Sequence, residues 1–138
     1  MKCADSVVLY ERPEFLYPFR VFTLEQANGA VPEVARVTAH VQERLDNLRR
    51  AYDEEDPEAG STLQAETRAL LTSWQEAIFE LGAEPKGIFT VDFRSPDPNV
   101  LWCWTVNEAE ILHHHFTWES FKDRVSIDLG THAWPSSN

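Results

Sequence analysis

Hydrophobic residues along this chain recur first at helical spacing and later at strand spacing. Between positions 24 and 52 they recur every three or four residues, which places them on one face of a long helix. Thr23 and Gln26 form a capping-box pattern that predicts where this helix begins. Pro32 lies inside the stripe, so we expect either a kink or a short first helix that restarts near Pro32.

An acidic stretch that contains a proline and a glycine, residues 53–60, interrupts the helical pattern. Ser61 and Gln64 then form a second capping-box pattern, and a second apolar stripe follows over residues 63–81. Gly82 is a typical helix stop. Two long helices joined by a short loop predict an antiparallel helical hairpin.

After Gly82 the apolar residues alternate, which is the period of a strand. Strands are predicted over residues 87–93, 100–106 and 111–117, with a short extended piece at 125–128. The expected fold class is α+β: a long antiparallel helical hairpin packed on a small three-stranded antiparallel sheet, which further short strands could extend.

The length of 138 residues fits one domain. We expect residues 1–21, which are rich in aromatics and prolines, to form an extended N-terminal arm. Residues 22–128 should form the single α+β domain, and residues 129–138 should be a C-terminal tail.

The formal net charge of −11 disfavours nucleic acid and anionic membranes as partners, because both are negatively charged. No stretch approaches the length of a transmembrane span, and the first residues lack the apolar core of a signal peptide. Of the two cysteines, Cys103 falls in an apolar strand pattern and is expected to be a small buried residue rather than a disulfide partner. We therefore expect a cytoplasmic protein.

The candidate chemistry lies at residues 108–115, where three of the five histidines and two glutamates occur together. A turn over residues 107–110 would pair Val106 with Ile111. Side chains alternate between the two faces of a strand, so this register predicts one face that carries four residues: Trp102, Trp104, His113 and His115.

The opposite face of the predicted sheet would carry His114, Cys103 and Asp92. The face with the two tryptophans is the more apolar one. We therefore expect the helices to cover it and to bury His113 and His115 beside the tryptophans.

Three interpretations of the histidines are open. In the first they are structural, and their ring nitrogens bond to backbone groups or carboxylates. In the second they bind a divalent transition metal, zinc or iron, because a His-x-His strand presents two imidazoles on one side and carboxylates complete such sites. In the third a His–carboxylate pair serves a small hydrolase or isomerase, although no nucleophile, phosphate-loop or nucleotide-binding motif accompanies it. The ligands expected for a metal are His115, His113, Glu110 and Asp92.

Metal binding is the leading hypothesis. The alternative is a non-catalytic interaction module, in which the helical hairpin forms a homodimer or partner surface, because long helical hairpins can assemble into four-helix bundles. Arg124 is expected to form an ion pair with Glu110 or Asp123, and the alternative is that it binds an anion. No small-molecule ligand can be named from the sequence.

A family resemblance extends from residue 22 to about residue 128. It opens on Phe22-Thr23-Leu24-Glu25-Gln26-Ala27-Asn28 with Val31-Pro32-Glu33-Val34 beyond it. Shorter matches follow in order: Glu80-Leu81-Gly82, Gly87, Val91-Asp92-Phe93, Cys103-Trp104, Glu108-x-Glu110-Ile111, His115 and Phe121-x-x-Arg124. In these motifs the chain resembles the prokaryotic domain-of-unknown-function family 2203.

The resemblance implies a fold and a set of residues, and it implies no activity. The family pattern has aromatic residues at the positions of His113 and His114, so His115 is the histidine of this cluster that the pattern shares. The implied residues are Asp92, Glu110, His115 and Arg124.

Overall fold

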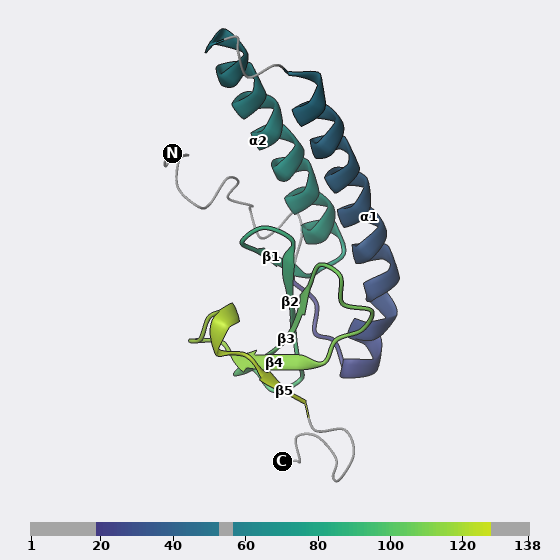
Figure 1. The fold of residues 1–138 in the computed structure, drawn as a ribbon. Coiled ribbons are helices and arrows are strands. Elements are labelled where there is room, and N and C mark those ends of the chain that lie inside the picture. The colour runs from purple at the N-terminus through teal and green to yellow at the C-terminus, as the bar shows by residue number, and fades with distance from the viewer. Residues whose placement is uncertain (1–18, 53–56, 128–138) are drawn as a thin grey trace.

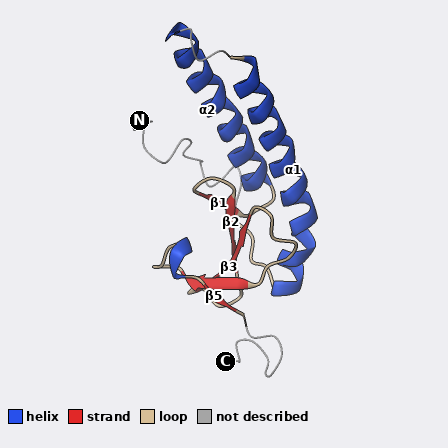
Figure 2. Cartoon of the chain, in the orientation of Figure 1, coloured by secondary structure: helices blue, strands red, loops and turns tan. Residues whose placement is uncertain are grey.

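A computed structural model describes residues 19–52 and 57–127 of the chain (Figure 1). Two helices lie side by side, and a twisted antiparallel sheet packs near one end of the pair (Figures 1 and 2). The other ends of both helices extend beyond the sheet. The fold class is α+β, as predicted. Residues 1–18 of the expected arm and the expected tail lie outside the described residues.

Helix α1 spans Leu24–Ala51. Its capping box is confirmed, because Thr23 Oγ1 accepts a hydrogen bond from the Gln26 amide and Gln26 Oε1 accepts one from the Thr23 amide, both at 3.0 Å. The helix continues through Pro32, so the expected restart there is wrong. Proline removes one helical hydrogen bond, but Val31 and Val34 on either side of it are buried and hold the turn in place.

Helix α2 spans Pro57–Glu80 and begins before the capping box predicted at Ser61. Proline explains the earlier start, because its fixed φ and missing N–H suit the first position of a helix. A buried hydrogen bond joins the two helices: Trp74 Nε1 donates to Thr38 Oγ1 at 2.9 Å. Neither described helix combines the length and the apolar character that a membrane crossing requires.

The sheet contains five antiparallel strands in the order β1-β2-β3-β4-β5, so two further short strands extend the three that were predicted. A 3-10 helix, Phe121–Asp123, precedes the last strand. The strands are β1 Glu84–Lys86, β2 Thr90–Arg94, β3 Val100–Thr105, β4 His113–Phe116 and β5 Val125–Ser126.

Strand β1 was not predicted, and residues 87–89, predicted as the start of a strand, form the turn between β1 and β2. Gly87 and Phe89 adopt positive φ angles of 53° and 63°. This left-handed backbone reverses the chain, and an alternating residue pattern does not reveal it.

The helices cover the sheet face that carries the tryptophans, as predicted. Trp102 and Trp104 of β3 belong to the same core as Val34 of α1 and Trp74 of α2. Trp74 also packs edge-on against Phe89, with ring centroids 5.3 Å apart. Residues that alternate with this core set along β2 and β3 therefore point away from the helices.

The pairing of β3 with β4 differs by one residue from the predicted register. Four pairs define it: Val100 with Phe116, Leu101 with His115, Trp102 with His114 and Cys103 with His113. A shift of one residue turns every side chain of a strand to the opposite face. His113 and His115 therefore lie on the face away from the helices, whereas His114 lies on the tryptophan face.

The connection between β3 and β4 explains this shift. Residues 106–112 form a loop, and Ile111 within it is fully buried. The Ile111 amide donates to the side-chain oxygen of Asn28 in α1 at 2.6 Å, and Asn107 adopts a φ of 79°. Because Ile111 enters the core instead of the sheet, β4 begins at His113.

Candidate functional site

Asp92, Cys103 and His115 come together on the sheet face that points away from the helices. Strands β2, β3 and β4 are neighbours, and each contributes one of the three. One possible ligand atom from each residue lies within 4.8 Å of the other two. The three residues are 2%, 0% and 4% exposed. They form a compact buried group with one nitrogen, one sulfur and one carboxylate.

Both ring nitrogens of His115 have partners. Nε2 lies 3.1 Å from each of the two carboxylate oxygens of Asp92, and Nδ1 lies 2.8 Å from the carbonyl oxygen of Phe116. A carbonyl can only accept, so Nδ1 carries a proton. In the metal-free protein Nε2 also needs a proton to face the carboxylate, and the hydrogen bond that it donates to Asp92 raises the pKa of His115 although burial opposes it.

Cys103 is a neutral thiol in this environment. Burial, followed by the charge of Asp92, raises the pKa of Cys103 to about 12. A thiol of this kind is a poor nucleophile. A bound metal could still take the position of its proton, since metal ligation deprotonates thiols.

Two cations lie beside the group. Lys86 Nζ is 3.5 Å from Asp92 Oδ2, and Arg124 Nη1 is 3.9 Å from Cys103 Sγ. Arg124 also donates to Glu108 Oε2 at 2.9 Å, so it does pair with a carboxylate, but with Glu108 instead of the expected Glu110 or Asp123. Lys86 is the cation with the more exposed side chain, at 46% against 17%.

The structure brings Asp92 and His115 together but separates them from the other two expected ligands. His113 lies on the same sheet face, and its Nδ1 is 3.7 Å from Glu108 Oε2 instead. Glu110 is exposed in the loop before β4. His114, opposite Trp102, is buried, and that burial lowers its pKa.

Cys103 and Lys86 were not expected at a site. Cys103 was correctly predicted to be buried and to share a face with Asp92, and only the register of β4 concealed that His115 joins them. Lys86 was missed because its strand, β1, was missed. The signal in the sequence that could have revealed Cys103 as a site residue was a predicted strand face that carries both an aspartate and a cysteine.

A cavity of about 460 Å³ opens beside Asp92 and His115. The segment that follows β4 forms its other wall. Its lining residues are Lys86, Gly87, Thr90, Asp92, His115, Glu119, Ser120 and Phe121. This volume lies within the range of small-molecule sites.

An acid–base role needs a ring nitrogen that can reach a substrate. His115 and a carboxylate do lie within hydrogen-bond reach, as the hydrolase or isomerase interpretation requires. Both nitrogens of His115 are engaged, however, by Asp92 and by Phe116. The arrangement therefore suits a ligand or a structural histidine better than a general base.

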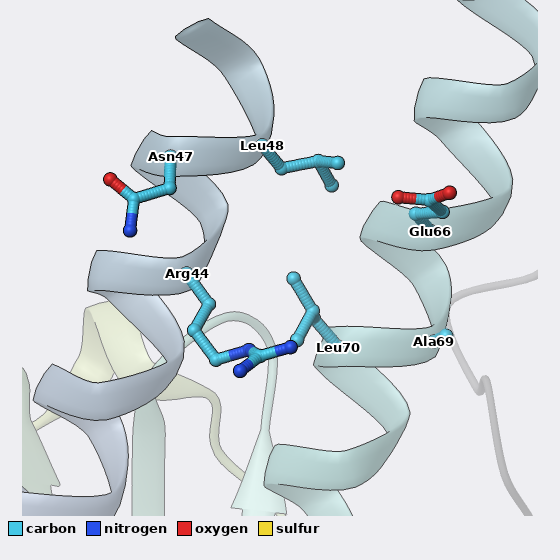
Figure 3. Close-up of a pocket in the computed structure, with 6 residues that line it drawn as sticks. All are labelled: Arg44, Asn47, Leu48, Glu66, Ala69 and Leu70. Atoms are coloured by element: carbon cyan, nitrogen blue, oxygen red, sulfur yellow. The ribbon is translucent and has the colours of Figure 1, made fainter. Parts of the chain in front are cut away.

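A second hollow lies between the helices, where they extend beyond the sheet (Figure 3). It measures about 530 Å³, and Leu48 of α1 and Leu70 of α2 point into the gap. The remaining lining residues are Arg44, Asn47, Glu66 and Ala69. Leu48 and Leu70 thus give this hollow an apolar lining.

Comparison with protein families matches residues 20–127 to the family described as Uncharacterized conserved protein (DUF2203). No curated protein and no solved structure matches the chain significantly. The matched residues cover more than half of the chain and agree closely with the span of the sequence resemblance. The chain therefore belongs to the DUF2203 family, which confirms the resemblance drawn from its motifs.

Proposed function

We propose that this protein binds a divalent transition metal through Asp92, Cys103 and His115. The observation that carries the proposal is the convergence of three buried ligand atoms of different chemistry within 4.8 Å of one another. Nitrogen, thiolate sulfur and carboxylate oxygen together suit zinc better than magnesium or calcium, and iron(II) is the second choice.

The hydrogen bonding of His115 supports the same proposal. Its Nδ1 proton is held by the Phe116 carbonyl, so Nε2 is the nitrogen that would ligate. Nε2 already faces the carboxylate that would share the ion. A metal would therefore replace the proton between His115 and Asp92, and binding should weaken as the pH falls.

The proposed ligand set differs from the one expected from sequence. Cys103 takes a place in it, while His113 and Glu110 lie outside it. Three protein ligands leave one position of a tetrahedral ion open, which is the arrangement of catalytic rather than structural zinc sites. A reducing compartment would keep Cys103 available as a ligand, and we propose the cytoplasm as its location.

Elemental analysis of protein purified without an affinity tag tests the proposal. We expect close to one zinc or iron per chain in the wild type and its loss in His115→Ala. His113→Ala is the matched control, because it removes a histidine from the same strand and face that is not among the proposed ligands. Circular dichroism should verify that both variants fold. Substoichiometric metal in the wild type, or equal metal in wild type and His115→Ala, would refute the proposal.

The hollow between the helices favours a second candidate function, a homodimer through the helical hairpin. Leu48 and Leu70 would be buried by a second copy, and Arg44 and Glu66 carry opposite charges that a two-fold axis could pair. Light scattering over a wide range of protein concentration tests this. A mass that stays at the monomer value throughout would contradict it.

A further inference from the structure

We propose that the cavity beside the metal site binds a small organic monocarboxylate, with its carboxylate on the open metal position next to Lys86 and its apolar part against Phe121. This inference rests on the proposed metal binding and adds the class of ligand. It draws on three features of the cavity: its position, its charge and its apolar wall.

The open coordination position of the metal would face the cavity, as the residues that line the cavity indicate. Asp92 and His115 line the cavity, whereas Cys103 does not. Cys103 is fully buried and belongs to β3, the strand between those of Asp92 and His115. An ion held by all three residues is therefore reached from the cavity side, and a ligand entering there meets the ion first.

Lys86 lines the cavity and favours an anion beside it. A divalent ion with one carboxylate, one thiolate and a neutral imidazole forms a neutral group. An ion that shares Asp92 would weaken this carboxylate as a counter-ion for Lys86. Its other acidic partner, Glu84 at 3.6 Å, already accepts a hydrogen bond from Arg94 at 2.6 Å. An incoming carboxylate would supply a counter-ion for the positive charge of Lys86.

The charge of the ligand is limited by Glu119. This carboxylate lines the same cavity, and its Oε1 accepts a hydrogen bond from the Phe116 amide at 2.9 Å. A second negative charge on the ligand would be repelled there, which favours a monocarboxylate over a phosphate or a dicarboxylate.

The apolar wall comes from the ring of Phe121. Arg124 lies against this ring, with its guanidinium carbon 4.3 Å from the ring centroid, and Arg124 is itself fixed by Glu108. The ring is therefore held in place beside the cavity. An aromatic or branched acid would find this apolar surface in the same cavity as Lys86.

Titration of benzoate into cobalt-substituted full-length protein tests the inference. Benzoate should change the visible cobalt spectrum, because a carboxylate would enter the coordination sphere. Benzamide, which has the same shape without the charge, should leave the spectrum unchanged at the same concentration. Calorimetry on the zinc-loaded protein should give the benzoate affinity of each variant.

Lys86→Met should weaken benzoate binding by about tenfold, the loss expected for one ion pair in a partly buried site, with zinc affinity unchanged or increased. Lys122→Met is the matched control, because Lys122 neighbours Phe121 in sequence but does not line the cavity. It should bind benzoate like the wild type.

The outcomes separate this inference from the proposed function. Metal binding without a spectral response to benzoate overturns the carboxylate site and leaves the metal site standing. Equal benzoate affinity in wild type and Lys86→Met also overturns the inference. A protein that takes up no cobalt or zinc refutes both.

Discussion

Replacement of Asp92 by Asn should destabilise the metal-free protein at low pH more than at high pH. Asn keeps the size and one oxygen of Asp92 but removes the charge that faces His115. His115 Nε2 and Asp92 Oδ1 are 3.1 Å apart, and both side chains are almost fully buried, so solvent screens their charges weakly. Hydrogen bonds to charged groups contribute about 1.5–3 kcal/mol, and we expect a loss of that size at pH 6.

The dependence on pH follows from the raised pKa of His115. A histidine whose pKa is higher in the folded state adds stability that is complete below its unfolded pKa, near 6.5, and is lost as the pH rises through its folded pKa. The wild type should therefore lose this contribution towards pH 9, whereas Asp92→Asn has little of it to lose. The difference in the free energy of unfolding should be large at pH 6 and shrink at pH 9.

Urea denaturation in the presence of a chelator, followed by tryptophan fluorescence, measures this difference. Asp46→Asn is the control, because Asp46 makes an exposed ion pair with Arg49 and should change stability by less than about 0.5 kcal/mol. An effect of Asp92→Asn that is equal at pH 6 and pH 9 would refute the ion-pair account of Asp92 and His115.

Three other predictions follow from buried contacts. Thr38→Val leaves the indole N–H of Trp74 without its acceptor and should lower the free energy of unfolding, measured by urea denaturation, by about 1–3 kcal/mol. Thr38→Ser keeps the hydroxyl and should cost less, and equal losses in the two variants would contradict the role of the hydroxyl. Asn28→Ala removes the acceptor of the Ile111 amide, so hydrogen exchange at that amide should accelerate well before global unfolding, and unchanged protection would show that this contact does not hold the loop. Cys103 should resist alkylation by iodoacetamide at pH 8 in the folded metal-free protein and react after unfolding, because burial raises its pKa to about 12; rapid alkylation of the folded protein would show that the thiol is accessible.

Much of the fold follows from local spacing. The capping box at Thr23, the two apolar stripes and the alternation along β2 and β3 each depend on residues close in sequence. For that reason the shared face of Asp92 and Cys103 could be predicted. The face of the sheet that the helices cover could also be predicted, because apolar side chains collect there.

The missing part of the site depends on contacts between distant residues. The register of β4 is set by Ile111, whose amide bonds to Asn28, 83 positions earlier in the chain. No local pattern encodes that contact, and without it His115 falls on the wrong face. Strand β1, with Lys86, depends on the positive φ angles of the turn at residues 87–89 and on pairing with β2. Of the three residues in the proposed site, the sequence therefore predicted Asp92 and His115 but not Cys103.

X-ray absorption at the zinc edge of the zinc-loaded protein tests the metal site most directly. The proposal predicts one sulfur neighbour at about 2.3 Å, together with nitrogen and oxygen neighbours at about 2.0–2.2 Å. The sulfur neighbour should disappear in Cys103→Ser, while the nitrogen and oxygen shell remains. A wild-type spectrum with only nitrogen and oxygen neighbours would contradict a site built from Asp92, Cys103 and His115.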